Sequence, residues 1–144
     1  MCITRALPER HYDVARKTPH RSDETMTKDF SQITRSVSAS LRPLRRDAPA
    51  LMAAFNALGD AAMKPGVLDA KTKELIALAL GVAGRCDPCL GFHAKALVEL
   101  GARREEVEEA VGVAVYMGGG PSLMYAGDAL DAFAQFSAAE QEAA

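Results

Sequence analysis

Apolar residues recur at spacings of three and four along most of this chain, which is the period of an amphipathic α-helix. The first stripe predicts a helix over residues 30–44, perturbed near its end by Pro43. A second helix is predicted to follow, with Asp47 as a candidate N-cap and Pro49 suited to the first turn, and to end before Pro65. The two stripes are Phe30, Ile33, Val37, Leu41 and Leu44, then Leu51, Phe55, Leu58 and Ala62.

A third helix is predicted over residues 70–84, with Asp69 as its N-cap. After one polar turn it reads LIALALGVA from Leu75 to Ala83, and a helix that is apolar all round must be covered all round. A domain of roughly 110 ordered residues has limited means to do that alone. We therefore expect part of this surface to meet another subunit.

A fourth helix is predicted with Cys86 or Asp87 as its cap and Pro88 at its first position. It is expected to run to Leu100, with Gly101 directly after its end. Its apolar face consists of Leu90, Ala94, Leu97 and Val98.

A fifth helix is predicted from Arg103, and the Gly118–Pro121 segment is expected to end it as a tight turn that allows close packing. That segment lacks the Lys-Ser/Thr of a phosphate loop, and no predicted strand precedes it. A sixth helix follows, with fraying over 139–144, so the prediction is an all-α domain of about six helices over residues 28–138. The last two stripes are Val107, Ala110, Val111, Ala114 and Val115, then Leu123, Ala126, Leu130 and Phe133.

Residues 1–27 show no sustained apolar period and carry two prolines and many charges, so we expect a disordered N-terminal tail. Met26, just before the patterned part, is a candidate natural start. The histidines and cysteine of this tail are interpreted as incidental solvated residues. They are Cys2, His11 and His20.

The composition and charge of the chain argue against several classes of function. Of the 144 residues, 49% are hydrophobic and none is Trp, which suits a helical domain. Residues 1–46 carry ten Lys and Arg against five Asp and Glu, whereas residues 47–144 carry seven against fourteen, and this acidic part argues against a nucleic-acid partner. We see no signal-peptide pattern and no apolar run near the ~20 residues of a membrane span. With three cysteines and no secretory pattern, we expect a cytoplasmic protein without a membrane partner.

The chemistry concentrates between Glu74 and His93, around the Cys86-x-x-Cys89 pair. Cys89 is predicted in a first helical turn, where free N–H groups and the helix dipole favour a thiolate. His93 lies one turn along on the same face and can exchange the thiol proton. An antiparallel return of the chain would bring Glu74 beside His93 as the group that holds the base. Tyr116 and Tyr125 are interpreted as core or interface residues.

Cys86 and Cys89 are spaced to form a disulfide. One cysteine would attack an oxidised substrate and become a sulfenic acid, the other would resolve it, and an outside dithiol would reduce the pair. Three alternatives remain open from the residues alone. Glu74, Cys86, Cys89 and His93 would be ligands of a zinc-stabilised helical module, the cysteines would be inert core residues, or the chain would be a non-catalytic thiol sensor.

At these residues the sequence resembles the AhpD-like alkylhydroperoxidase family, within the carboxymuconolactone decarboxylase superfamily. The match is Glu74 followed by Cys86-x-x-Cys89-x-x-x-His93, and the downstream ELGARREEVEEAVGVAVYMGGGP segment is similar as well. The resemblance covers roughly residues 28–136, which is most of the chain except the tail. The best-known members place a second histidine before the second cysteine, where this chain has Pro88, so peroxidase turnover is expected to be poorer.

The resemblance implies an all-helical subunit that assembles into a trimer or hexamer, without a tightly bound cofactor. It implies a peroxidatic Cys89, a resolving Cys86, and a proton relay of Glu74 with His93. The implied substrate is a hydroperoxide, and the implied reductant is a dithiol protein, either lipoylated or thioredoxin-like. A general thiol–disulfide oxidoreductase is the alternative activity. The decarboxylase branch lacks the paired cysteines, so the pair argues against decarboxylation.

Overall fold

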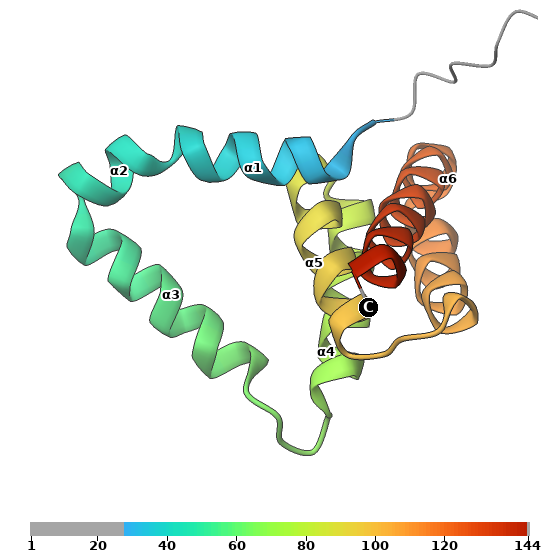
Figure 1. The fold of residues 1–144 in the computed structure, drawn as a ribbon. Coiled ribbons are helices and arrows are strands. Elements are labelled where there is room, and N and C mark those ends of the chain that lie inside the picture. Colours follow the sequence, from blue (N-terminus) through green and yellow to red (C-terminus); the bar gives the residue numbers. More distant parts are fainter. Residues whose placement is uncertain (1–27, 144) are drawn as a thin grey trace, which may run out of the picture.

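The described part of the chain, residues 28–143 of a computed structural model, is helical (Figure 1). The all-α prediction is confirmed, whereas the prediction for residues 1–27 lies outside the described part. The helices are α1 Phe30–Ser40, α2 Arg42–Asp47, α3 Pro49–Met63, α4 Ala70–Ala83, α5 Asp87–Glu99 and α6 Arg104–Ala143. No helix within these residues combines the length and apolar character needed to cross a membrane.

The hydrophobic core lies where α4, α5 and the two halves of α6 meet (Figure 1). The apolar face predicted for residues 88–100 is buried, as are the central positions of the stripe predicted after Arg103. Burial of these side chains supplies the main force that holds the helices together. The buried apolar residues are Phe30, Leu78, Val82, Leu90, Ala94, Leu97, Val98, Val107, Val111, Ala114, Ala126, Ala129, Ala132 and Phe133.

A glycine lets α1 approach α5 closely. A Cβ at Gly91 would lie 2.6 Å from the Thr34 Cγ2 and 3.3 Å from the Phe30 carbonyl oxygen. The Thr34 hydroxyl donates to the same carbonyl at 3.0 Å, so the methyl is held toward α5. Phe30 is fully buried at this crossing. The absence of a side chain at position 91 is therefore what brings the start of α1 into the core.

The structure corrects two details of the predicted N-terminal helices. Pro43 divides the segment 30–44 in two, because proline fits the first turn of a new helix better than the interior of an old one. Asp47 is not an N-cap: it ends α2 and pairs with Arg46 at 2.7 Å, while Ala48 occupies the cap position of α3 without a side-chain bond. The Asp69 N-cap is confirmed, since its carboxylate accepts from the Thr72 N–H at 2.7 Å.

The predicted turn at Gly118–Pro121 is a kink within α6. Gly119 has φ 66° and ψ −153°, a conformation that breaks the helix at one residue without a connecting loop. The predicted fraying from 139 is not observed, as α6 continues to Ala143 through residues of high helix propensity. The predicted core positions Leu44 and Leu123 are 42% and 53% exposed, so both are corrections to the stripes.

The α3 helix stands apart from the core, joined to it through α2 on one side and the 64–69 loop on the other (Figure 1). None of its residues is buried. The apolar stripe predicted for it exists, but Leu51, Phe55 and Leu58 are 58%, 67% and 66% exposed. An exposed apolar face of this kind marks an interaction site more often than a free surface.

Substituting Gly91 with Ala is expected to lower the free energy of unfolding by about 1–2 kcal/mol, because overpacking against Thr34 outweighs the gain in helix propensity. Gly127 in α6 is the matched control: a Cβ there meets nothing within 4 Å. Gly127→Ala should therefore raise stability by about 0.5–1 kcal/mol. Urea denaturation of both variants measures the difference. Equal gains in stability for the two would contradict the close approach of α1 to α5.

Candidate functional site

The site is built on the corner between α4 and α5. The Cys86 N–H donates to the Gly81 carbonyl at 3.1 Å, and the Arg85 N–H donates to the Val82 carbonyl at 3.2 Å. This pair of bonds is the Schellman motif, which requires a left-handed residue after the helix end. Arg85 is that residue, with φ 54°, although glycine is favoured at such a position. The motif fixes the place of Cys86 relative to α4.

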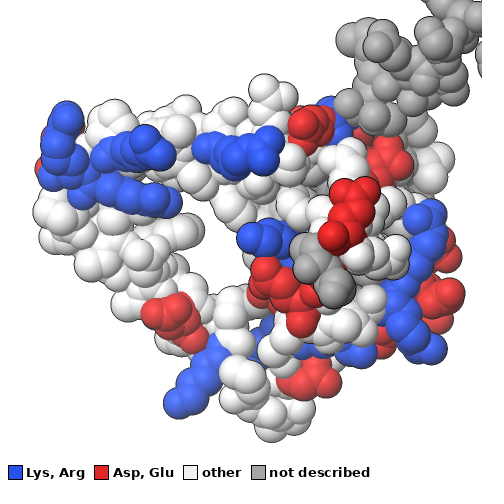
Figure 2. All heavy atoms as spheres, viewed as in Figure 1, with Lys and Arg blue, Asp and Glu red and all other residues white. Residues whose placement is uncertain are grey.

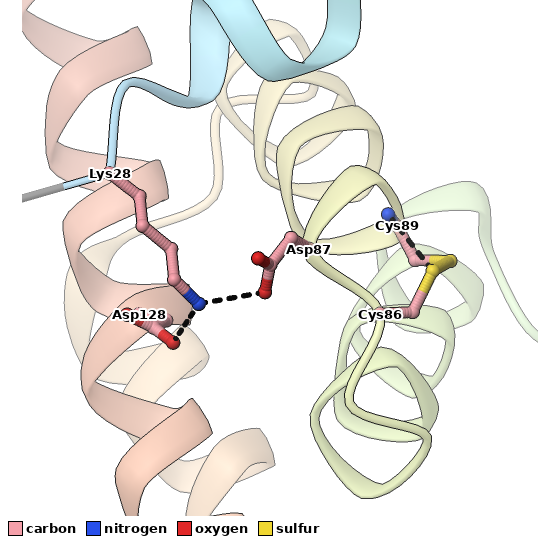
Figure 3. A network of polar contacts seen from close by, with 5 residues as sticks. All are labelled: Lys28, Cys86, Asp87, Cys89 and Asp128. Carbon is pink, nitrogen blue, oxygen red and sulfur yellow. Dashed lines mark hydrogen bonds and ion pairs between the residues drawn. A yellow bond between two sulfur atoms is a disulfide. The ribbon is translucent and has the colours of Figure 1, made fainter. Parts of the chain in front are cut away.

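Cys86 is also the N-cap of α5. Its Sγ accepts from the Cys89 N–H at 3.3 Å, and it forms a disulfide with Cys89 across a Cα–Cα distance of 5.2 Å (Figure 3). The structure thus shows the predicted Cys86–Cys89 pair in its oxidised form. Cys86 is the cap of α5 rather than Asp87, so Asp87 is its first residue, Pro88 its second and Cys89 its third.

The predicted contact between Glu74 and His93 is confirmed. The Glu74 Oε2 lies 2.7 Å from the His93 Nδ1, across the antiparallel α4 and α5 helices. The two side chains are 15% and 31% exposed, so the contact is only partly screened by water. With Nδ1 held by the carboxylate, Nε2 is the ring nitrogen left to exchange a proton.

The four predicted residues therefore all lie on the α4–α5 hairpin, with the cysteines at its corner and the Glu74–His93 contact farther along the two helices, and not all of them touch. Glu74 is hydrogen-bonded to His93, and the Cys89 N–H is hydrogen-bonded to the Cys86 sulfur. Within the described residues 28–143, no hydrogen bond joins His93 to either sulfur. The catalytic roles of these residues stay predictions. Within the described residues, no group of three or more His, Cys, Asp or Glu side chains is placed to hold a metal ion.

Three further charged residues lie beside the cysteines and were missed from the sequence. The Lys28 Nζ donates to Asp87 and to Asp128, each at 2.8 Å (Figure 3). Partial burial disfavours the charged form, but the hydrogen bonds to Asp128 and Asp87 outweigh it and raise the pKa of Lys28. Lys28 lies 59 positions from Asp87 and 100 positions from Asp128 in the sequence. No local sequence pattern therefore predicted these contacts. The one sequence feature that could have drawn attention to this cluster is the position of Asp87 between the two cysteines.

Two cavities lie near these elements. An apolar groove of about 380 Å³ runs between α4 and the first half of α6. A more open cavity of about 500 Å³ lies between the start of α1 and the end of α6 and does not touch the cysteines. The lining of the groove includes Leu75, the neighbour of Glu74 in the chain, so of these two cavities the groove is more closely associated with the site. Its lining is Thr72, Leu75, Ile76, Ala79, Leu80, Ala83, Ala110, Val113, Ala114 and Met117.

Comparison with known proteins places this arrangement in a family. A family model described as the carboxymuconolactone decarboxylase family matches residues 49–132, which include all four predicted site residues. The chain is 39% identical over 108 residues to an uncharacterized protein of Cupriavidus necator, covering 75% of this chain and 96% of that protein. An uncharacterized protein of the Paracoccus denitrificans cox locus is 36% identical over 93 residues, covering 65% and 84% of the two chains.

Solved structures agree with these sequence matches. A carboxymuconolactone decarboxylase family protein from Legionella pneumophila is 56% identical, with a TM-score of 0.73 over 75% of this chain and 96% of that chain. A family protein from Thermotoga maritima is 32% identical, with a TM-score of 0.60 over 65% and 96%. The latter is described as having a suggested part in an antioxidative response.

The backbone conformation at Arg85 predicts an unusual response to substitution. Arg85→Gly should raise the free energy of unfolding by about 0.5–1 kcal/mol, because glycine adopts the left-handed conformation without steric cost. Arg85→Val should lower it by about 1 kcal/mol, since a β-branched residue is disfavoured there. Urea denaturation of the oxidised variants gives both values. A loss of stability in Arg85→Gly would show instead that the arginine side chain supports the corner.

Proposed function

The chain belongs to the carboxymuconolactone decarboxylase family, and from this membership and the geometry of the corner we propose that it is a thiol-dependent peroxidase of the AhpD-like type. Its proposed substrates are organic hydroperoxides. The observation that carries the proposal is the Glu74–His93 contact of 2.7 Å one helical turn from Cys89, which belongs to a disulfide in the structure. A base held by a third group beside a thiol is the arrangement of an activated nucleophile.

The proposed reaction begins from the reduced pair. The Cys89 thiolate attacks the outer oxygen of the hydroperoxide, the O–O bond breaks, and the alkoxide leaves as an alcohol after taking a proton. His93, held by Glu74, is the proposed donor of that proton and the base that first takes the thiol proton. The position of Cys89 in the first turn of α5 supports the thiolate, because the helix dipole and the free N–H groups favour negative charge there.

The second half of the reaction produces the state that the structure describes. The Cys86 thiol attacks the Cys89 sulfenic sulfur, water leaves, and the Cys86–Cys89 disulfide forms. An external dithiol then reduces this disulfide by two successive exchanges, and becomes a disulfide itself. We propose a lipoylated or thioredoxin-like protein as that partner. The chain supplies the redox chemistry with its own sulfurs, so the proposal needs no bound cofactor.

A second candidate, a general thiol–disulfide oxidoreductase, is favoured by one observation. The Cys86 Sγ accepts the Cys89 N–H at 3.3 Å as the N-cap of α5, and this bond would stabilise Cys86 as a leaving thiolate during exchange. Pro88 stands where better-known relatives carry another histidine, which weakens proton delivery to a peroxide but leaves disulfide exchange intact. The two candidates differ in whether peroxide oxidises the reduced pair.

The test is the intact mass of the reduced protein before and after one equivalent of an organic hydroperoxide. The wild type should lose two hydrogens, whereas Cys89→Ser should lose none and consume no peroxide. Cys86→Ser should stop at a Cys89 sulfenic acid that a dimedone reagent traps. Glu74→Gln and His93→Gln should each slow peroxide consumption by about 10²–10⁴.

Glu99→Gln is the matched control for Glu74→Gln, since Glu99 is an exposed carboxylate at the far end of α5 that pairs with Lys95. It should keep wild-type turnover. Unchanged peroxide consumption in both Cys89→Ser and Cys86→Ser would overturn the peroxidase proposal. A wild type that peroxide leaves reduced, yet that exchanges with an external disulfide, would select the oxidoreductase instead.

We also propose that the active form is a homo-oligomer, a trimer or hexamer, in which α3 of one copy covers the apolar groove of another. Both surfaces are apolar and both lack cover within the described chain: the α3 stripe is more than half exposed, and Ile76 and Leu80 of the groove are 47% and 67% exposed. The α3 helix is held away from its own core by the 64–69 loop (Figure 1). A second copy of the chain is therefore the partner that would cover both the α3 stripe and the groove.

Charge supports the same pairing. Lys and Arg gather along α1 and α2, next to α3 (Figure 2), whereas residues 47–144 carry fourteen acidic against seven basic residues. An arm with a basic end would thus approach an acidic body, which speeds association and favours one orientation. The basic residues of α1 and α2 are Arg35, Arg42, Arg45 and Arg46.

Phe55→Glu is expected to convert the assembly into monomers, because it places a charge in an apolar interface. Val67→Glu is the matched control: Val67 is fully exposed in the loop after α3 and should tolerate the same change. Light scattering coupled to gel filtration measures the mass of each variant. A monomeric wild type, or an assembly that Phe55→Glu leaves intact, would refute this mode of assembly.

A further inference from the structure

The three charged residues beside the cysteine pair form a cluster that no step of the proposed reaction uses. Lys28 precedes α1, Asp87 is the first residue of α5, and Asp128 lies in the second half of α6. The Lys28 ammonium also lies 4.8 Å from the centre of the Tyr125 ring. Side chains from three parts of the fold thus converge next to the redox corner, and Figure 3 shows Lys28, Asp87 and Asp128 among them.

The position of Asp87 gives this cluster a chemical consequence. Its carboxylate lies in the first turn of α5, between the two cysteines in sequence, where a negative charge is attracted to the same N–H groups that favour a thiolate. Figure 3 shows this carboxylate pointing toward Lys28, with the cysteine sulfurs on the opposite side of the α5 turn. The Lys28 ammonium, which Asp87 shares with Asp128, therefore partly offsets the negative charge of Asp87 and holds its carboxylate on the side away from the sulfurs.

The backbone around Lys28 is fixed independently of its side chain. The Gln135 side chain donates to the Lys28 carbonyl at 2.8 Å and accepts from the Phe30 N–H at 3.0 Å. Phe30 itself is fully buried in the core. Removal of the Lys28 ammonium alone should hence leave the chain in place, which makes the charge testable without loss of the fold.

We propose that Lys28 is a positioning residue that sets the redox equilibrium of the Cys86–Cys89 pair by holding Asp87 and partly offsetting its charge. This inference rests on the proposed function only in requiring that the two cysteines exchange between dithiol and disulfide. Without Lys28, the unpaired Asp87 carboxylate repels a thiolate at either cysteine and competes for the amide groups of the α5 N-terminus. The reduced form loses stability, and the disulfide becomes harder to reduce.

The experiment is equilibration of the full-length protein with reduced and oxidised glutathione at pH 8, with the dithiol fraction read by alkylation and mass. Two glutathione thiols reduce the protein disulfide and leave as one glutathione disulfide, so the equilibrium constant reports the reduced form directly. Lys28→Gln should lower this constant by about threefold to tenfold, which corresponds to about 15–30 mV. Asp87→Asn should raise it, and Lys28→Arg should restore the wild-type value because its guanidinium can bridge both carboxylates.

The double variant tests the route of the effect. In the Asp87→Asn background, loss of Lys28 should change the constant by less than about twofold, since the carboxylate within the cysteine motif, through which Lys28 is proposed to act, is then absent. Lys95→Gln is the matched control: it removes a lysine from the exposed side of α5, where Lys95 faces Glu99 at 3.7 Å, and should leave the constant unchanged.

Three outcomes overturn the inference in different ways. An unchanged constant in Lys28→Gln, with only a lower melting temperature, makes Lys28 a structural brace. An effect of Lys28→Gln that persists in the Asp87→Asn background shows that it does not act through Asp87. A wild type that does not exchange with glutathione at all refutes the redox function itself, and this result is separate from the other two.

Discussion

The antiparallel packing of α4 against α5 is the constraint on which the rest of the structure depends. The corner between them is closed by the Schellman bonds from Arg85 and Cys86, and Cys86 then caps the next helix. Because the corner is so short, Glu74 and His93 face each other across the two helices at 2.7 Å. The core side chains of α6 close over this pair of helices and hold the corner in place.

Local sequence signals predicted the parts of the site that lie within this hairpin. The spacing of Cys89 and His93 predicted that both lie on one helical face, and an antiparallel return of the chain was expected to bring Glu74 beside His93. The cap could not be decided from the sequence, since cysteine and aspartate both suit that position. In the structure the N-cap of α5 is Cys86, because the left-handed conformation of Arg85 places Cys86 at the start of the helix.

Features that depend on distant parts of the chain escaped the prediction. The Lys28 contacts with Asp87 and Asp128 span 59 and 100 positions, and no periodic pattern encodes such a pairing. The apolar stripe of α3 was predicted, but not its exposure, because an amphipathic period indicates that a face needs cover and does not identify the surface that covers it. The kink at Gly119 was anticipated only as a turn, since glycine and proline mark a break without fixing its angle.

The α4 helix connects the proposed assembly with the proposed chemistry. Its buried side chains Leu78 and Val82 face the core, Ile76 and Leu80 line the apolar groove, and Glu74 holds His93. A second copy seated in the groove would exclude water one turn from Glu74, and a lower local dielectric strengthens its contact with His93. In this proposal, α4 takes part in both assembly and proton transfer. Its apolar surface would then serve the contact with a second copy as well as the packing of its own core.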